Sequence, residues 1–212
     1  MFRVVVIALV LVAACQDDVK TPFPEGLEPL EDNPVPDLDG HPEELRLSSS
    51  EKDYIRIYGR GYIHAEPAAV WTATKDPEVM AAICKTSTHT IMLGAEPGSE
   101  RYELAYVVHY FVDDILNVEW DDAWRYGTIV GTPDALADGM IKHQKIQGSD
   151  FITLSVGTVE ILATDDPEIT EISFVEYLDA VQASTLDVAI SVKHNYDTIV
   201  AAVHHTPVPS CN

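Results

Sequence analysis

The chain has 212 residues, of which 46% are hydrophobic, and its 13 basic and 35 acidic side chains give a formal net charge of −22. This length suits one folded domain with a leader and a tether, and the hydrophobic fraction is high enough for a core, which argues against a fully disordered chain. The negative charge argues against binding to nucleic acid or to anionic membrane surfaces. We interpret it as a solvated, repulsive surface that keeps the protein soluble, with a cationic partner or bound calcium as the alternative.

Residues 1–14 predict a signal peptide. Arg3 precedes an unbroken apolar run over residues 4–14, which is too short for a membrane-spanning helix of about 20 residues but suits a secretory leader. The sequence VAAC at residues 12–15 resembles a bacterial lipobox. That resemblance implies cleavage before Cys15 and attachment of acyl chains such as palmitate to this cysteine, which is enough for a stable membrane anchor. The alternative is an ordinary cleaved signal with an incidental cysteine.

The lipobox resemblance also implies a location and a division of the chain. The protein is expected in the bacterial cell envelope, and Gln16 after the cysteine favours the outer membrane, with the domain in the periplasm or at the cell surface. Residues 15–50 are rich in Pro, Asp and Glu, so they predict a disordered tether that holds the folded domain, residues 51–212, off the membrane. Residues 43–57 are expected to form a short helix at the junction.

Two further cysteines remain if Cys15 is lipidated. Cys84 and Cys211 are an even number of thiols in an oxidising compartment, where disulfides persist. A disulfide between them is one interpretation, and a buried free Cys84 with a loose Cys211 is the other. The sequence leaves this choice open because it does not supply the geometry that a disulfide requires.

Residues 55–64 predict the first strand of the domain, and a proline-marked pair of helices follows. Pro67 ends the strand and starts a helix that carries Trp71, while Asp76 caps a second helical segment that ends near residue 86. The strand, the sequence Ala-x-Pro-x-x-Val-Trp and the following Asp-Pro-Glu resemble the opening of domains of the START-like (SRPBCC) superfamily. The order of the remaining elements extends this resemblance over about three quarters of the chain.

β-rich patterns predict further strands downstream, over residues 87–92, 101–113, 140–146, 151–163 and 169–178. Residues 101–113 are largely apolar on both faces, which indicates a strand covered on two sides. Residues 114–129 are acidic and aromatic, and residues 133–139 are expected to form a loop or one helical turn.

The last predicted element is an amphipathic helix over residues 186–203. A long helix after a run of antiparallel strands is similar to the helix-grip arrangement of the START-like superfamily. The resemblance implies an α+β fold in which a curved antiparallel sheet wraps around the long C-terminal helix and leaves an apolar cavity between them.

Eight side chains are candidates for lining this cavity: Tyr106, Val108, His109, Tyr110, Trp120, Trp124, Glu176 and Tyr196. His109 and Glu176 lie within apolar segments of predicted strands, and a buried polar group needs a partner. If both point inward, they orient the polar end of a ligand or act as acid and base. The alternative is that they face solvent or satisfy one another, and that the aromatic residues are ordinary core.

Other kinds of site find little support in the sequence. The histidines and cysteines match no zinc motif, and no serine-nucleophile elbow or phosphate-binding glycine loop is present, so we predict no metal, no cofactor and no catalytic residues. Asp113, Asp114, Glu119, Asp121 and Asp122 offer oxygen ligands for calcium, but their spacing matches no EF-hand, and a solvated acidic loop is preferred.

These observations predict a membrane-tethered monomer that binds an apolar small molecule, such as a lipid, a sterol or a polyketide-like compound. Binding is favoured over catalysis, with a cyclase or dehydratase that uses the same cavity as the alternative. A second alternative is a lipoprotein without a cavity that only contacts other proteins.

Overall fold

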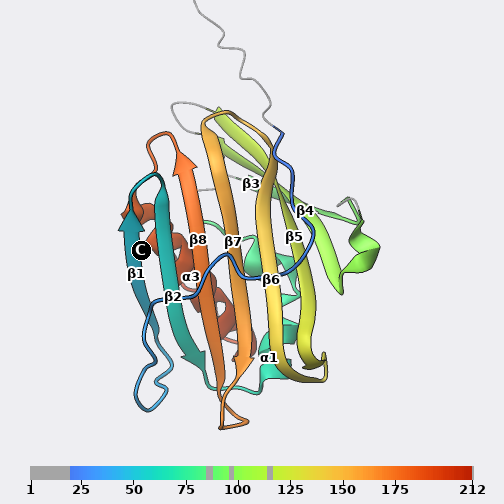
Figure 1. Ribbon diagram of the computed structural model, residues 1–212, viewed down its shortest axis with the longest axis vertical. Coiled ribbons are helices and arrows are strands. Elements are labelled where there is room, and N and C mark those ends of the chain that lie inside the picture. Colours follow the sequence, from blue (N-terminus) through green and yellow to red (C-terminus); the bar gives the residue numbers. More distant parts are fainter. Residues whose placement is uncertain (1–19, 85–87, 96–97, 114–116, 212) are drawn as a thin grey trace, which may run out of the picture.

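A computed structural model describes residues 20–84, 88–95, 98–113 and 117–211. These residues form an eight-stranded antiparallel sheet in the order β1-β2-β8-β7-β6-β5-β4-β3, which curves around a long C-terminal helix (Figure 1). The strands are β1 (Leu45–Glu51), β2 (Ile55–Ile63), β3 (Thr88–Leu93), β4 (Leu104–Asp113), β5 (Asn117–Thr132), β6 (Ala135–Gly148), β7 (Ile152–Ala163) and β8 (Thr170–Ala180). The helices are α1 (Pro67–Thr74), α2 (Pro77–Met80), the short 3-10 helix η1 (Ser99–Arg101) and α3 (Thr185–Val203). The predicted α+β helix-grip architecture is confirmed.

The main core lies between the inner face of the sheet and the helices. In β4, alternate side chains point to this face, so Tyr106, Val108 and Tyr110 are buried there. In α3, Val192, Tyr196 and Ile199 recur at helical spacing and close the core from the other side. Among the helices of the described residues, none is both long enough and apolar enough to span a membrane.

The helices begin where the sequence predicts. Pro67 occupies the first turn of α1, and Trp71 of the same helix is fully buried. The side chain of Asp76 accepts a hydrogen bond from the backbone N–H of Glu78, which caps α2, and Ser184 caps α3 in the same way. The second helix is shorter than expected: α2 ends at Met80, whereas the sequence predicted an end near residue 86.

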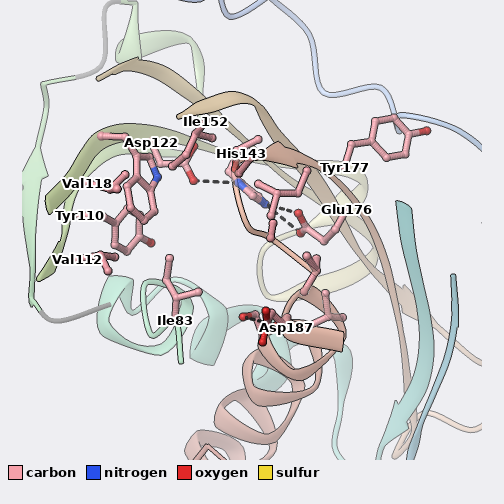
Figure 2. A pocket seen from close by; sticks show the side chains of 18 of the residues that line it. Ile83, Tyr110, Val112, Val118, Asp122, His143, Ile152, Glu176, Tyr177 and Asp187 are labelled. Atoms are coloured by element: carbon pink, nitrogen blue, oxygen red, sulfur yellow. Dashed lines mark hydrogen bonds and ion pairs between the residues drawn. The ribbon is translucent and has the colours of Figure 1, made fainter. Parts of the chain in front are cut away.

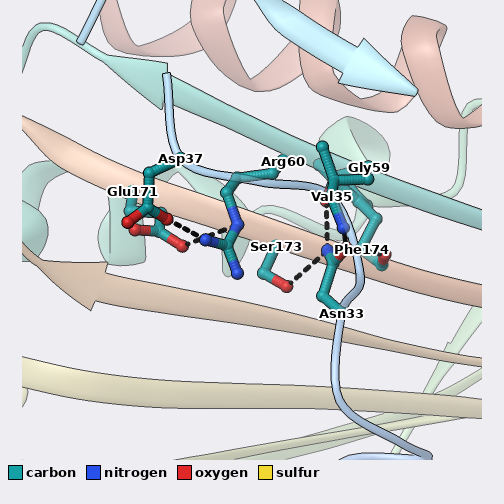
Figure 3. Close-up of polar contacts among 8 residues, drawn as sticks. All are labelled: Asn33, Val35, Asp37, Gly59, Arg60, Glu171, Ser173 and Phe174. Carbon is teal, nitrogen blue, oxygen red and sulfur yellow. Dashed lines mark hydrogen bonds and ion pairs between the residues drawn. The ribbon is translucent and has the colours of Figure 1, made fainter. Parts of the chain in front are cut away.

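Residues 20–44, which we call the N-terminal strap, correct the prediction of a disordered tether. The strap runs across the outer face of β2, β8, β7 and β6 (Figure 1). Its Val35 and Leu38 are 4% and 1% exposed. The Asn33 amide donates to the backbone oxygen of Gly59 at 2.8 Å and to Ser173 Oγ at 2.9 Å (Figure 3). The folded domain therefore begins well before residue 51.

The strap is ordered for a reason that composition does not reveal. Its few apolar side chains each fill a place on the sheet, where Val35 joins a small cluster with Tyr58 and Val175. Two of its carboxylates also have partners, since Glu31 accepts from the hydroxyl of Tyr58 at 2.7 Å and Asp37 pairs with Arg60 (Figure 3). A proline-rich extended segment suits this position on the outer face of the sheet, because proline has no backbone N–H that would need an acceptor.

Three other local predictions are also wrong. Residues 45–51 are strand β1, not part of a helix over residues 43–57, because they pair with β2. Residues 117–129 of the acidic and aromatic segment lie in β5, and residues 135–139 of the expected loop lie in β6. These two strands pair with each other along most of their length. Pairing across long strands supplies the backbone hydrogen bonds, so unfavourable local composition is overridden.

A disulfide joins Cys84 to Cys211 with a Cα–Cα distance of 5.5 Å. It ties the chain that follows α3 to the segment that follows α2. Of the two interpretations of these cysteines, the structure has the bridge.

Candidate functional site

A cavity of about 370 Å³ lies between the inner face of the sheet and the N-terminal half of α3. Its walls are mainly apolar: Tyr110, Val112, Val118 and Ile83 surround it in Figure 2, and Val188 and Val192 of α3 complete it. Val181 also lines the cavity and is 61% exposed, so the cavity opens to solvent beside the connection between β8 and α3.

One wall of the cavity is polar, and three strands build it. His143 on β6, Gly157 on β7 and Glu176 on β8 are direct cross-strand neighbours. The ring nitrogen Nε2 of His143 lies 2.9 Å and 3.1 Å from the two carboxylate oxygens of Glu176 (Figure 2). The two side chains therefore meet above the intervening strand.

Gly157 makes this contact possible. A Cβ atom placed on it would lie 2.2 Å from Nε2 of His143 and 2.2 Å from both carboxylate oxygens of Glu176. No atom larger than hydrogen fits at this point, so a side chain on residue 157 is incompatible with the pair.

Asp122 on β5 completes the polar wall. Its Oδ2 lies 3.1 Å from Nδ1 of His143, and the residue is only 4% exposed. Trp124, two residues further along the same face of β5, stacks on the His143 ring with centroids 4.3 Å apart. The imidazole is thus held between two carboxylates and against an indole.

This setting decides the charge of the ring. Burial disfavours the imidazolium, but the charges and hydrogen bonds of Glu176 and Asp122 outweigh it and raise the pKa of His143 to about 10. Burial also raises the pKa of Glu176, and the opposing charge of His143 limits that rise. At neutral pH His143 is therefore charged, and each of its two N–H groups donates to a carboxylate.

The structure places four of the eight predicted cavity residues on the cavity wall: Tyr110, Trp120, Trp124 and Glu176. The other four do not line it. Tyr106 and Val108 are in the core, where the hydroxyl of Tyr106 bonds that of Tyr126 at 2.8 Å. Tyr196 is also in the core and donates to the backbone oxygen of Tyr62 at 2.6 Å.

His109 is a correction, because it lies on the opposite face of β4. Side chains alternate along a strand, so the residue between two inward positions, Val108 and Tyr110, must point outward. Its side chain is 41% exposed, and its Nδ1 lies 2.7 Å from Asp121 Oδ1.

The prediction missed Asp122, His143 and Gly157. Asp122 belonged to the acidic segment that was expected to be a solvated loop, yet it is buried in β5. Alternation offered a clue, since Trp120, Asp122 and Trp124 share one face of that strand, whereas Asp121 points to the other. This split also separates the carboxylates that were weighed as calcium ligands.

One group of possible metal ligands occurs among the residues described. Ligand atoms of Cys84, His194 and Cys211 lie within 4.8 Å of one another. Both sulfur atoms are in the disulfide, so neither is a thiolate that could bind a metal.

Sequence comparison gives no relatives: no family model matches the chain, and no curated protein matches it. Comparison of structures finds many similar folds. The STAR-related lipid transfer protein from Xanthomonas axonopodis is 8% identical, with a TM-score of 0.51 over 81% of this chain and 95% of that one. The lipid transfer and protein localization domain of human StarD13 is 7% identical, with a TM-score of 0.50 over 78% and 85%. A START superfamily protein from Mycobacterium smegmatis is 11% identical, with a TM-score of 0.50 over 71% and 97%. On the ground of this likeness, the chain shares the helix-grip fold of these proteins.

Proposed function

We propose that this protein is a membrane-tethered START-like domain that binds an apolar small molecule, such as a lipid, a sterol or a polyketide-like compound, in the cavity beside α3. The observation that carries the proposal is the cavity itself, which is mainly apolar, has one polar wall and opens to solvent beside Val181. Its volume of about 370 Å³ is at the lower end of the range for small-molecule sites.

Burial of apolar surface supplies the driving force. Each methylene group that leaves water contributes about 0.8 kcal/mol, so a ligand with about ten buried methylenes gains about 8 kcal/mol. Association costs at least about 4 kcal/mol in lost freedom of motion. The balance favours binding without any contribution from the polar wall, which then sets the orientation of the ligand.

The membrane part of the proposal rests on residues 12–15 of the sequence, and Cys15 lies outside the described residues. The start of the strap supports it, because the backbone N–H of Thr21 bonds the oxygen of Ile146 at 2.8 Å near the end of β6. Phe151 lies just beyond the following turn, lines the cavity and accepts a backbone hydrogen bond from Val181 at 2.8 Å.

The strap therefore starts at the end of the sheet where the cavity opens. Five residue steps separate Cys15 from Lys20, a reach of at most about 18 Å. A lipid on Cys15 would hold the domain close to the bilayer, with the open end of the cavity on the membrane side. Outer-membrane attachment, with the domain in the periplasm or at the cell surface, is part of this proposal.

A cavity-filling variant tests the binding function. In Val188→Trp the larger side chain enters the cavity from α3, whereas in Lys193→Trp the same residue is added to the exposed side of the helix. We expect the full-length protein to take up an environment-sensitive apolar dye, Val188→Trp to lose most of this uptake and Lys193→Trp to keep it. Mass spectrometry of the extracted protein would identify a natural ligand. Equal uptake by the two variants would count against the cavity as the binding site.

The enzymatic alternative has one supporting observation, the buried chain of Asp122, His143 and Glu176. However, a general base needs a free lone pair near the working pH, and His143 is protonated with both N–H groups engaged. This geometry favours binding over catalysis. The other alternative was a lipoprotein without a cavity that only contacts other proteins. It is not supported, because the side chains leave a cavity between the sheet and α3.

A further inference from the structure

The hydrogen-bonding capacity left on the polar wall is uneven. His143 spends one N–H on Asp122 and the other on Glu176, so its ring has no donor left for a ligand. The two carboxylates, in contrast, keep acceptor capacity. Both oxygens of Glu176 share a single N–H, and Oδ1 of Asp122 is buried without any hydrogen bond.

The unpaired Oδ1 of Asp122 indicates that a ligand binds here, because a buried acceptor without a partner is rare and costly in folded proteins. The residue is 4% exposed, lines the cavity and lies on its upper side next to His143 in Figure 2. The strand also presents a donor beside it, since Nε1 of Trp124 is buried without a hydrogen bond. A ligand hydroxyl has the chemistry for either atom, because a hydroxyl donates to a carboxylate and accepts from an indole N–H.

The charge on this wall points in the same direction. Two carboxylates face one imidazolium, so the wall carries excess negative charge when Glu176 is ionised. The nearby ammonium group of Lys145 does not project from this wall as a free donor, since its Nζ donates to the backbone oxygens of Ser149 and Ile152 at 2.7 and 2.6 Å. A ligand carboxylate would meet like charge in a poorly solvated place, whereas a hydroxyl or an ammonium group would meet an acceptor.

We propose that the cavity selects amphipathic molecules whose polar end donates a hydrogen bond, an alcohol or a protonated amine, and that it discriminates against molecules that end in a carboxylate. This inference rests on the proposed binding function and names the class of ligand that the same site takes. The apolar walls hold the body of the ligand, and Asp122 holds its polar end.

A competition experiment with three probes of equal chain length tests the proposal. A long-chain alcohol, the corresponding amine and the corresponding fatty acid each displace a neutral apolar dye from the full-length protein at neutral pH. We expect the alcohol or the amine to compete at least about tenfold more strongly than the acid. Stronger competition by the amine than by the alcohol would assign the selection mainly to charge, and the reverse would assign it mainly to hydrogen bonding.

Matched variants assign the effect to one side chain. Asp122→Asn removes the charge and leaves the shape, so the preference over the acid should fall by about tenfold or more. Asp121→Asn makes the same change at the next residue, which faces away from the cavity, and should keep the preference. Glu176→Gln serves as a second variant on the same wall if Asp122→Asn does not fold, as judged by its thermal unfolding.

The outcomes separate this proposal from the one that it rests on. If the dye binds and the three probes compete equally, or the acid competes best, the selection for donors is wrong and the binding function stands. The selection is equally wrong if Asp122→Asn and Asp121→Asn behave alike. If neither dye nor probe binds, both proposals fail.

Discussion

Replacement of Gly157 by alanine tests whether the polar wall depends on the missing side chain. Gly157 does not have a positive φ, so alanine changes the contact without straining the backbone. The added Cβ would lie 2.2 Å from the facing atoms of both His143 and Glu176, so it must separate the pair. Breaking a buried, hydrogen-bonded charge pair costs about 3–5 kcal/mol, and alanine recovers about 0.5–1 kcal/mol of the conformational cost of glycine. We expect a net loss of about 3 kcal/mol in the free energy of unfolding.

Thermal and urea unfolding measure this loss. For a domain of this size, about 3 kcal/mol corresponds to a fall of roughly 6–12 °C in Tm. Gly59→Ala is the control, because there the new Cβ would meet the ends of the flexible side chains of Leu47 and Leu45 at 3.1 and 3.3 Å. The reasoning is refuted if Gly157→Ala is as stable as the unchanged protein, or if the NMR signals of the His143 ring show that its contact with Glu176 persists.

Three further predictions concern pH, the disulfide and the strap. The folded pKa of His143 is about 10 against 6.5 for an ordinary histidine, so its stabilising contribution is complete below about pH 6.5 and is lost as the pH rises toward 10. Denaturation at a series of pH values should show this decline in the free energy of unfolding. If the His143→Gln variant shows the same pH dependence as the unchanged protein, the prediction is contradicted. Reduction of the Cys84–Cys211 bridge, which spans 127 residues, should lower the free energy of unfolding by up to about 4–5 kcal/mol, measured by denaturation with and without reductant. An unchanged midpoint would show that the bridge does not constrain the unfolded chain. Asn33→Ala removes hydrogen bonds to the sheet and should cost about 1–2 kcal/mol and speed proteolysis within residues 20–44, whereas alanine at the exposed Asp39 should do neither. Equal cleavage rates for the two variants would argue against the role of Asn33.

Local physical rules were sufficient for much of the framework. The apolar alternation of β4 and the three-and-four spacing of α3 are properties of neighbouring residues, and both elements are where these patterns predict them. Pro67 and Asp76 likewise mark helix starts through effects that act within one turn. The order of these elements already indicates a helix enclosed by a curved sheet.

The sequence was less informative wherever a residue depends on partners far along the chain. The strap has the composition of a disordered tether, and only the outer face of the sheet supplies the places for Val35 and Leu38. His109 and His143 both lie in strands, and the pairing of the whole sheet decides that one faces outward and the other faces the cavity.

The sequence by itself therefore determined most of the strands, the terminal helix and their order, because backbone preference and hydrophobic periodicity act over a few residues. It did not reveal β1, β5 or the first part of β6. Only the tertiary structure decided that Asp122, His143 and Glu176 meet over Gly157. These four residues come from four successive strands between positions 122 and 176, and the register of those strands is set by the packing of the whole inner face. Contacts between distant residues form the polar wall, and no local pattern encodes them.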